Sequence, residues 1–83
     1  MLRYCVIGAG HGGLAMAGHL GVMGFPVTLW ARNPKALEPI DAAGGVFLEG
    51  EVEGFGPLQV AYSLETALKA ADVVLVVLPA SAH

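Results

Sequence analysis

A cluster of four glycines between residues 8 and 13 limits the fold of this chain more than any other feature. A short apolar run, Tyr4 to Ile7, leads directly into the cluster, and a stretch with helical spacing of apolar residues follows it. Gly8, Gly10 and Gly13 stand in the spacing G-x-G-x-x-G. This spacing is weak evidence alone, but between a strand and a helix it is typical of a phosphate-binding turn.

Each motif glycine has a separate physical task in such a turn. Gly8 lets the chain leave the strand sharply, Gly10 lets a diphosphate approach the backbone, and Gly13 lets the helix lie close to the strand. The unpaired N–H groups at the helix start, among them those of His11 and Gly12, then face the diphosphate. These five residues are therefore predicted to bind a dinucleotide, and the alternative is a glycine-rich turn without a ligand.

The composition of the chain excludes several classes of function and partner. With 83 residues, 55% hydrophobic and 13% charged, the chain suits a part of a larger buried core. A net charge of -3 argues against nucleic acid and anionic membrane surfaces as partners. The longest apolar run, residues 73–78, is too short to span a bilayer. The single cysteine, Cys5, permits no internal disulfide, which fits a reducing, cytoplasmic location.

Strand and helix signals alternate along the chain. Strands are predicted at about residues 3–7, 27–31, 58–62 and 73–78, and helices at about 12–23, after Asn33-Pro34, and after Ser63. This alternation predicts an α/β fold, a Rossmann-type doubly wound parallel sheet with strand order 3-2-1-4. The last strand is apolar on both faces, which is typical of a strand with neighbours on both sides. We therefore expect residues 1–83 to form the front part of a dinucleotide-binding domain, with later strands and a substrate domain elsewhere in a longer protein.

The end of the second strand bears on the choice of cofactor. In this fold an acidic residue there would bind the ribose hydroxyls of NAD, but no acid occurs between Gly13 and Glu38. Instead the sequence reads Ala31-Arg32-Asn33, in which a small residue leaves room for a 2′-phosphate and the arginine supplies a planar cation. These three residues are predicted to bind the cofactor, with NADP preferred and NAD as the alternative.

The middle of the chain contains Pro39, which should break the short helix after Asn33 early. Residues 46–56 are rich in glycine and contain three alternating glutamates, so a small hairpin or irregular loop with solvated carboxylates is predicted. We expect no metal site here, because alternating glutamates usually mark the wet face of a strand.

The carboxyl end of the fourth strand should border the ligand crevice. Leu78, Pro79 and Ala80 are predicted to contact the cofactor, and Ser81 should lie with them beside the nicotinamide ribose. His83 is the candidate catalytic residue, as an acid near the site of hydride transfer, and the alternative is a structural residue at the start of a further helix.

The chain resembles the N-terminal domain of the octopine/nopaline (opine) dehydrogenase family. The segments that carry the resemblance are VIGAGHGGLAMAGHL, MGFPVTLWARNP, EGEVEGFG and DVVLVVLPASAH. The resemblance implies an NAD(P)-dependent oxidoreductase that reduces the imine formed between an amino acid and a 2-keto acid. It also implies a second, helical domain that binds these substrates, so the 83 residues alone should be inactive. His11 departs from the family, whose members often carry Asn or another small polar residue at this position. Its side chain is expected either to donate to a phosphate or to face solvent.

Other functions remain open from the residues themselves. The glycine motif and second strand also fit glycerol-3-phosphate dehydrogenases and ketopantoate reductases, which would be distinguished by their substrate domains. A non-catalytic module that senses a nucleotide is a third alternative. A homodimer is compatible with any of the three.

Overall fold

The computed structural model describes residues 1–48 and 54–77 and contains a four-stranded parallel sheet. Its strands, in spatial order, are β5 (Gln59–Val60), β2 (Val27–Trp30), β1 (Tyr4–Ile7) and β6 (Val73–Val76). Tyr4 of β1 lies opposite Val27 on one side and Val73 on the other. Because β5 and β6 are the third and fourth strands of this sheet along the chain, the predicted order 3-2-1-4 is confirmed.

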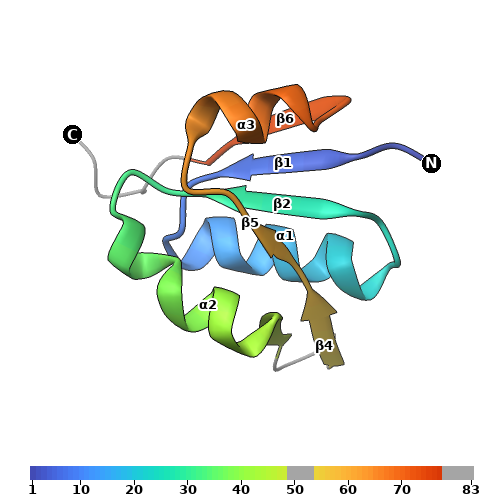
Figure 1. Ribbon diagram of the computed structural model, residues 1–83. Coiled ribbons are helices and arrows are strands. Elements are labelled where there is room, and N and C mark those ends of the chain that lie inside the picture. The colour runs from blue at the N-terminus through green and yellow to red at the C-terminus, as the bar shows by residue number, and fades with distance from the viewer. Residues whose placement is uncertain (49–53, 78–83) are drawn as a thin grey trace.

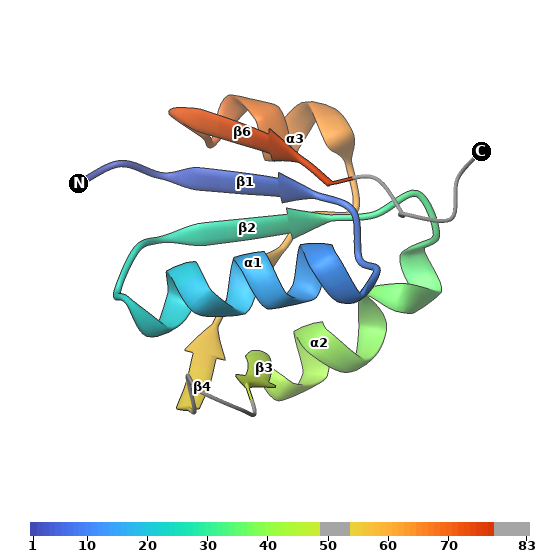
Figure 2. The same ribbon diagram turned by 180° about the vertical axis from the view of Figure 1, so that it is seen from behind.

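Helices cover both faces of the sheet, as expected for a doubly wound fold (Figures 1 and 2). One face is covered by α1 (His11–Val22) and α2 (Glu38–Ala43), which follows the 3-10 helix η1 (Pro34–Ala36), and the other by α3 (Leu64–Lys69). Alternate side chains of β1 lie on opposite faces of the sheet. Val6 belongs to the main core, and Cys5 belongs to a small core with Ala67 of α3. Both side chains are fully buried, so β1 is the centre of the fold.

Helix α1 ends in a double hydrogen-bonded turn that returns the chain to the sheet. Gly24 has φ +93°, and its N–H donates to the Gly21 carbonyl, while the Phe25 N–H donates to the Leu20 carbonyl. This pair of bonds is the Schellman motif, which needs a residue with positive φ and therefore favours glycine. The Phe25 ring then packs edge-on against Tyr4 at 5.1 Å between centroids, which fixes the entry into β2.

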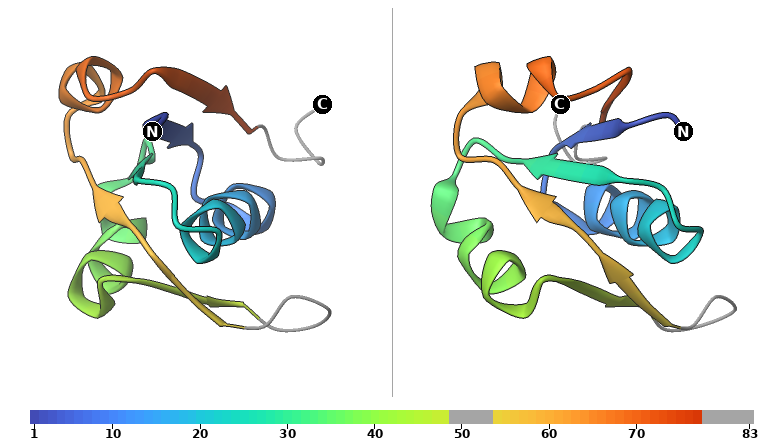
Figure 3. Two further views of the ribbon diagram at one scale, coloured as in Figure 1. Left: turned by 90° about the vertical axis from the view of Figure 1, so that its right-hand side faces the viewer. Right: turned by 45° about the vertical axis from the view of Figure 1, so that its right-hand side comes forward.

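A second, two-stranded antiparallel sheet consists of β3 (Gly45–Leu48) and β4 (Gly54–Pro57) and confirms the predicted hairpin (Figure 3). It packs on α1 through glycine: a Cβ added to Gly18 would lie 2.7 Å from Val46, and one added to Gly56 would overlap the Gly18 carbonyl oxygen. Residues 49–53, with the glutamates predicted to be solvated, lie outside the described residues.

One local prediction is confirmed and one needs correction. The helix after Asn33-Pro34 is short and interrupted, as predicted: it ends as η1 at Ala36, and Pro39 lies in the first turn of a separate helix, α2, where its missing N–H costs nothing. The last strand is not buried on both faces, because Val74 and Val76 are 40% and 63% exposed. These two residues point to the α3 side of the sheet, and the small helix α3 does not extend over the edge strand.

Within residues 1–48 and 54–77, none of the helices has the length and apolar character that crossing a membrane requires.

Candidate functional site

The turn between β1 and α1 has the geometry that the glycine motif predicts. Gly8 has φ +124°, a conformation that residues with a side chain rarely adopt, and an added Cβ would lie 2.5 Å from the Val77 carbonyl oxygen. A Cβ on Gly13 would overlap the carbonyl oxygen of Gly8. Both glycines are therefore required by packing, since they bring α1 directly against the end of β1.

The remaining part of the turn is open. Gly10, His11 and Gly12 are all exposed, and a Cβ added to Gly10 would meet no atom within 4 Å. Packing within the described residues thus gives no reason for glycine at position 10, in contrast to Gly8 and Gly13. Space directly above a backbone at a helix start is what a closely bound phosphate requires.

The first turn of α1 offers unpaired donors. Gly10 is the N-cap residue and makes no side-chain capping hydrogen bond, and its carbonyl accepts the Leu14 N–H at 2.9 Å. The N–H groups of His11, Gly12 and Gly13 precede that bond and so have no acceptor within the helix. No acidic residue lies in this first turn, so the partial positive charge of the helix end is not neutralised by a carboxylate there.

The three residues after β2 that were predicted to bind the cofactor differ in their surroundings. Ala31 is buried in the main core, so its side chain packs inward, whereas Arg32 is exposed. Asn33 is the N-cap of η1, and its side-chain oxygen accepts the Lys35 N–H at 3.0 Å. That oxygen is therefore already engaged in capping. Lys35 is a further exposed cation at this edge, which the β2 pattern alone did not single out.

The four basic residues of the chain divide into two groups. Arg3, before β1, pairs with Asp72 at 3.2 Å, and Lys69 on α3 pairs with Glu65 at 3.1 Å. Arg32 and Lys35 both follow β2, and no carboxylate in the described part of the chain forms an ion pair with either. Two cations thus lie at the carboxyl edge of the sheet, the edge that also carries the glycine turn.

The predicted residues at the end of the chain, Leu78, Pro79, Ala80, Ser81 and His83, lie outside the described residues. The residue before them is placed: the Val77 N–H donates to the Ile7 carbonyl at 3.0 Å. A Cβ added to Gly12 would lie 3.2 Å from the Val77 side chain. The chain therefore leaves β6 directly beside the glycine turn.

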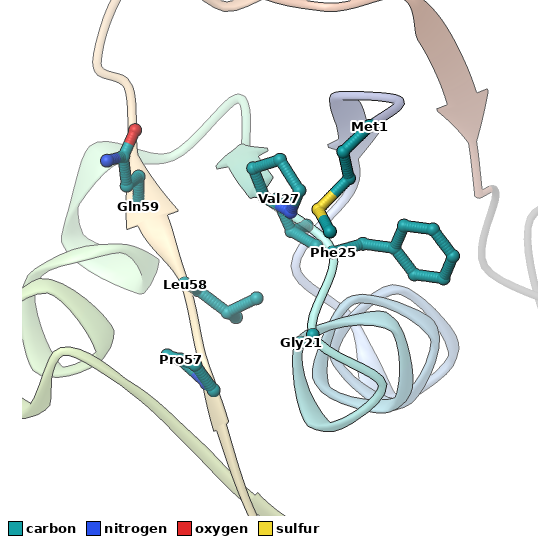
Figure 4. Close-up of a pocket in the computed structure, with 9 residues that line it drawn as sticks. Met1, Gly21, Phe25, Val27, Pro57, Leu58 and Gln59 are labelled. Carbon is teal, nitrogen blue, oxygen red and sulfur yellow. The ribbon is translucent and has the colours of Figure 1, made fainter.

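An apolar pocket of about 400 Å³ lies at the opposite end of the sheet (Figure 4). Its lining comes from the end of α1, the start of β2 and the segment before β5, including Gly21, Phe25, Val27 and Leu58. It contains no ionisable side chain, and ligands of open α/β sheets bind at the carboxyl ends of the strands. We therefore do not assign the cofactor to this pocket. No group of three metal-ligating side chains occurs within residues 1–48 and 54–77.

Comparison with known protein families shows the family of this chain. Residues 3–83 match the family described as the NAD binding domain of 6-phosphogluconate dehydrogenase. The chain belongs to this family. Membership agrees with the open, donor-rich turn at the start of α1.

Individual relatives support the more specific resemblance. The chain is 34% identical, over 82 residues, to the opine dehydrogenase of Arthrobacter sp. (strain 1C), which confirms the resemblance to opine dehydrogenases. Among solved structures, an imine reductase variant from Myxococcus stipitatus in complex with NAD+ has a TM-score of 0.69 at 23% identity over 94% of this chain. An oxidoreductase described as putative from Pseudomonas putida KT2440 has a TM-score of 0.66 at 28% identity over 92% of it.

These relatives are much longer. The match covers 96% of this chain but 23% of the opine dehydrogenase, and 23% and 22% of the two solved chains. The family and the NAD-binding fold are thus shown, and this chain spans about a quarter of the length of these relatives.

Proposed function

We propose that the chain is the cofactor-binding part of an NAD(P)-dependent oxidoreductase of the opine dehydrogenase type. The observation that carries the proposal is the open backbone at Gly10, which lies at the start of a helix whose first-turn amides have no acceptor. The 34% identical opine dehydrogenase supports the reaction class, the reductive condensation of an amino acid with a 2-keto acid.

In this function the backbone of residues 8–13 holds the diphosphate. Gly10 leaves room for it, and the amides of His11, Gly12 and Gly13 donate to its oxygens. The nicotinamide supplies the hydride, and the protein orients it. Leu78, Pro79 and Ala80 follow the strand that ends beside the turn, and we assign them to the nicotinamide side of the cofactor. His83 remains the proposed catalytic acid.

The adenosine end of the cofactor is assigned to the segment after β2. Buried Ala31 leaves the space above the strand end free of a long side chain, and exposed Arg32 supplies a cation for a 2′-phosphate. Lys35 adds a second positive charge nearby. An acid that would favour the unphosphorylated ribose of NAD is absent from the sequence between Gly13 and Glu38. We therefore propose a preference for NADP.

Substrate chemistry is assigned to a second, helical domain in the complete protein. Within residues 1–48 and 54–77, no group of three or more His, Cys, Asp or Glu side chains is placed to hold a metal ion. We propose that residues 1–83 are the N-terminal part of the cofactor domain and are inactive in isolation.

The cofactor preference is tested in the complete protein by titration with NADPH and NADH. We expect Arg32→Ala to weaken NADPH binding about tenfold or more, because a charge-assisted hydrogen bond to phosphate is worth roughly 1.5–3 kcal/mol. NADH binding should change little. Lys69→Ala is the matched control, since it also removes an exposed cation, but on α3.

Equal affinity for NADPH in the wild type and Arg32→Ala proteins would contradict the assignment of Arg32. The reaction class is tested separately, by following cofactor oxidation with pairs of amino acids and 2-keto acids. Oxidation with dihydroxyacetone phosphate or ketopantoate alone would instead favour the glycerol-3-phosphate dehydrogenase or ketopantoate reductase alternative.

A further inference from the structure

The segment that follows β2 carries four exposed charged side chains at a spacing of three residues. The cations Arg32 and Lys35 come first, and the acids Glu38 and Asp41 follow on α2. Leu37, which joins η1 to α2, has φ -87° and ψ -25°, so a helical conformation continues from Lys35 to Asp41. Side chains three residues apart in a helix are neighbours on its surface. Two acids therefore follow the cations along one side of this segment.

The acids nevertheless do not pair with the cations. In the part of the chain that the structure describes, neither Arg32 nor Lys35 takes part in an ion pair. The carboxylate of Asp41 is engaged elsewhere, because its Oδ2 accepts the hydroxyl of Tyr62 at 3.1 Å. This hydrogen bond joins α2 to the segment after β5, which lies 21 residues further along the chain.

Tyr62 stands at the carboxyl edge of the sheet, beside the end of β2. Leu29 of β2 lies opposite Val60 of β5. The Leu29 carbonyl also accepts the Ala61 N–H at 3.0 Å, so the parallel pairing continues beyond β5. Two residues after Val60, Tyr62 is therefore level with Ala31, directly before the first of the two cations. Its side chain is half exposed, and its hydroxyl reaches α2, which packs against β5.

The surroundings of the phenol keep it a hydrogen-bond donor. Partial burial raises the pKa of Tyr62, and the carboxylates of Asp41 and Glu38 raise it further. The phenol is therefore protonated at neutral pH and has a hydrogen to donate. Both acids of the segment thus lie near Tyr62, at the side of the sheet where β5 is the edge strand.

We propose, on the basis of the proposed function, that Tyr62 is a positioning residue for the 2′-phosphate of NADP. Its hydroxyl holds the Asp41 carboxylate toward β5, which leaves Arg32 and Lys35 unpaired for the phosphate. Without this bond the carboxylate would compete with the phosphate for the cations. An acid at this edge favours the unphosphorylated ribose of NAD, so Tyr62 contributes to the preference for NADP.

The ratio of the affinities for NADPH and NADH, measured by titration of the complete protein, tests this role. We expect Tyr62→Phe to weaken NADPH binding about fivefold, which is the effect of one exposed ion pair that competes with the phosphate. NADH binding should stay as in the wild type. Tyr4→Phe is the matched control and should leave both affinities unchanged. Tyr4 is the other tyrosine of the chain, and its hydroxyl makes no hydrogen bond within residues 1–48 and 54–77.

A second substitution separates positioning from a purely structural role. Asp41→Asn removes the charge but keeps an oxygen that accepts a hydrogen bond. In the Tyr62→Phe/Asp41→Asn protein the released side chain is neutral, so NADPH affinity should return to within about twofold of the wild type. If the hydroxyl only stabilised the fold, both cofactors would bind Tyr62→Phe more weakly, and Asp41→Asn would restore neither. Thermal unfolding of each variant reports whether the fold is retained.

Two results would overturn the role of Tyr62. One is a ratio of NADPH to NADH affinity that Tyr62→Phe leaves unchanged, and the other is a double variant that binds NADPH as weakly as Tyr62→Phe alone. A complete protein that binds neither cofactor, or that binds NADH more tightly than NADPH, would contradict the proposed function and this inference with it. Failure of the inference alone and failure of the proposed function are therefore distinguishable.

Discussion

Replacing Gly10 with alanine should separate the binding role of the turn from its structural role. Gly10 has φ -74° and ψ -179°, which alanine adopts without strain, and the new methyl group would meet no atom within 4 Å. We therefore expect Gly10→Ala to retain the fold and to lose cofactor affinity.

The expected change in stability is a small difference between two effects. Alanine lowers the conformational entropy of the unfolded chain, which stabilises the fold by about 0.4–1 kcal/mol. Alanine is also a poorer N-cap than glycine, at a cost of about 1 kcal/mol. The free energy of unfolding should thus change by less than about 1 kcal/mol, the larger of these two contributions.

The expected change in binding is larger. The methyl group would occupy the space through which a phosphate approaches the backbone, so at least one amide-to-phosphate hydrogen bond is lost. Such a bond to a charged group contributes roughly 1.5–3 kcal/mol, which corresponds to about a 10- to 100-fold weaker affinity. NADPH fluorescence titration of the complete protein measures this change, and thermal unfolding measures stability.

Gly13→Ala is the matched control, with the opposite expectation. Its new Cβ would overlap the Gly8 carbonyl oxygen and lie 2.8 Å from the Gly8 carbonyl carbon, so α1 must move away from β1. Overpacking of this kind costs about 1–3 kcal/mol and is offset in part by the helix preference of alanine over glycine of about 1 kcal/mol, so we expect a net loss of up to about 2 kcal/mol. The binding role of Gly10 would be refuted if the Gly10→Ala protein bound NADPH as tightly as the wild type. It would also be refuted if Gly10→Ala lost as much stability as Gly13→Ala.

Two further predictions concern ionisable groups. Hydrogen bonds from Arg3 hold the pKa of Asp72 below its usual value, so this pair stabilises the fold at neutral pH and the stabilisation is lost as pH falls through the lowered pKa. Asp72→Asn should therefore lower the melting temperature at neutral pH, with the difference from wild type disappearing in acid; an equal difference at all pH values would contradict this. Burial raises the pKa of the Cys5 thiol, and its exposed fraction is 0%, so thiol reagents should label it only after denaturation. Mass spectrometry after brief labelling checks this, and rapid labelling of the folded protein would oppose it.

The backbone of the fold was predictable because its signals are local. The positive φ of Gly8, the Gly24-Phe25-Pro26 stop after α1, and the Ser63 cap of α3 each determine backbone conformation within a few residues. The Ser63 hydroxyl accepts the Thr66 N–H at 3.4 Å, as an N-cap should. Strand order followed from connections between these elements, because β–α–β units have one preferred hand.

The errors arose where burial depends on distant segments. The sequence of β6 is apolar at every position, but whether Val74 and Val76 are covered depends on what lies over the edge of the sheet. Likewise, Leu64 and Leu68 stand four residues apart on α3, a spacing typical of an apolar helix face, but they are 38% and 41% exposed, while Ala67 is buried. The hydrophobic pattern of a sequence shows which side chains are suited to a core. It does not show which of them are covered by another segment of the chain.

Residue order alone was sufficient to establish a strand that turns through glycine into a helix, because backbone freedom and helix capping act over a few neighbouring residues. Folding in three dimensions established the different reasons for these glycines: Gly8 and Gly13 are required by contacts with Val77 and with each other, whereas Gly10 faces open space. It also brought Arg32 and Lys35 to the same sheet edge as that turn, since parallel strands end together. Contacts between segments far apart in the chain cannot be deduced from local conformation, and they distinguish a packing glycine from a binding one.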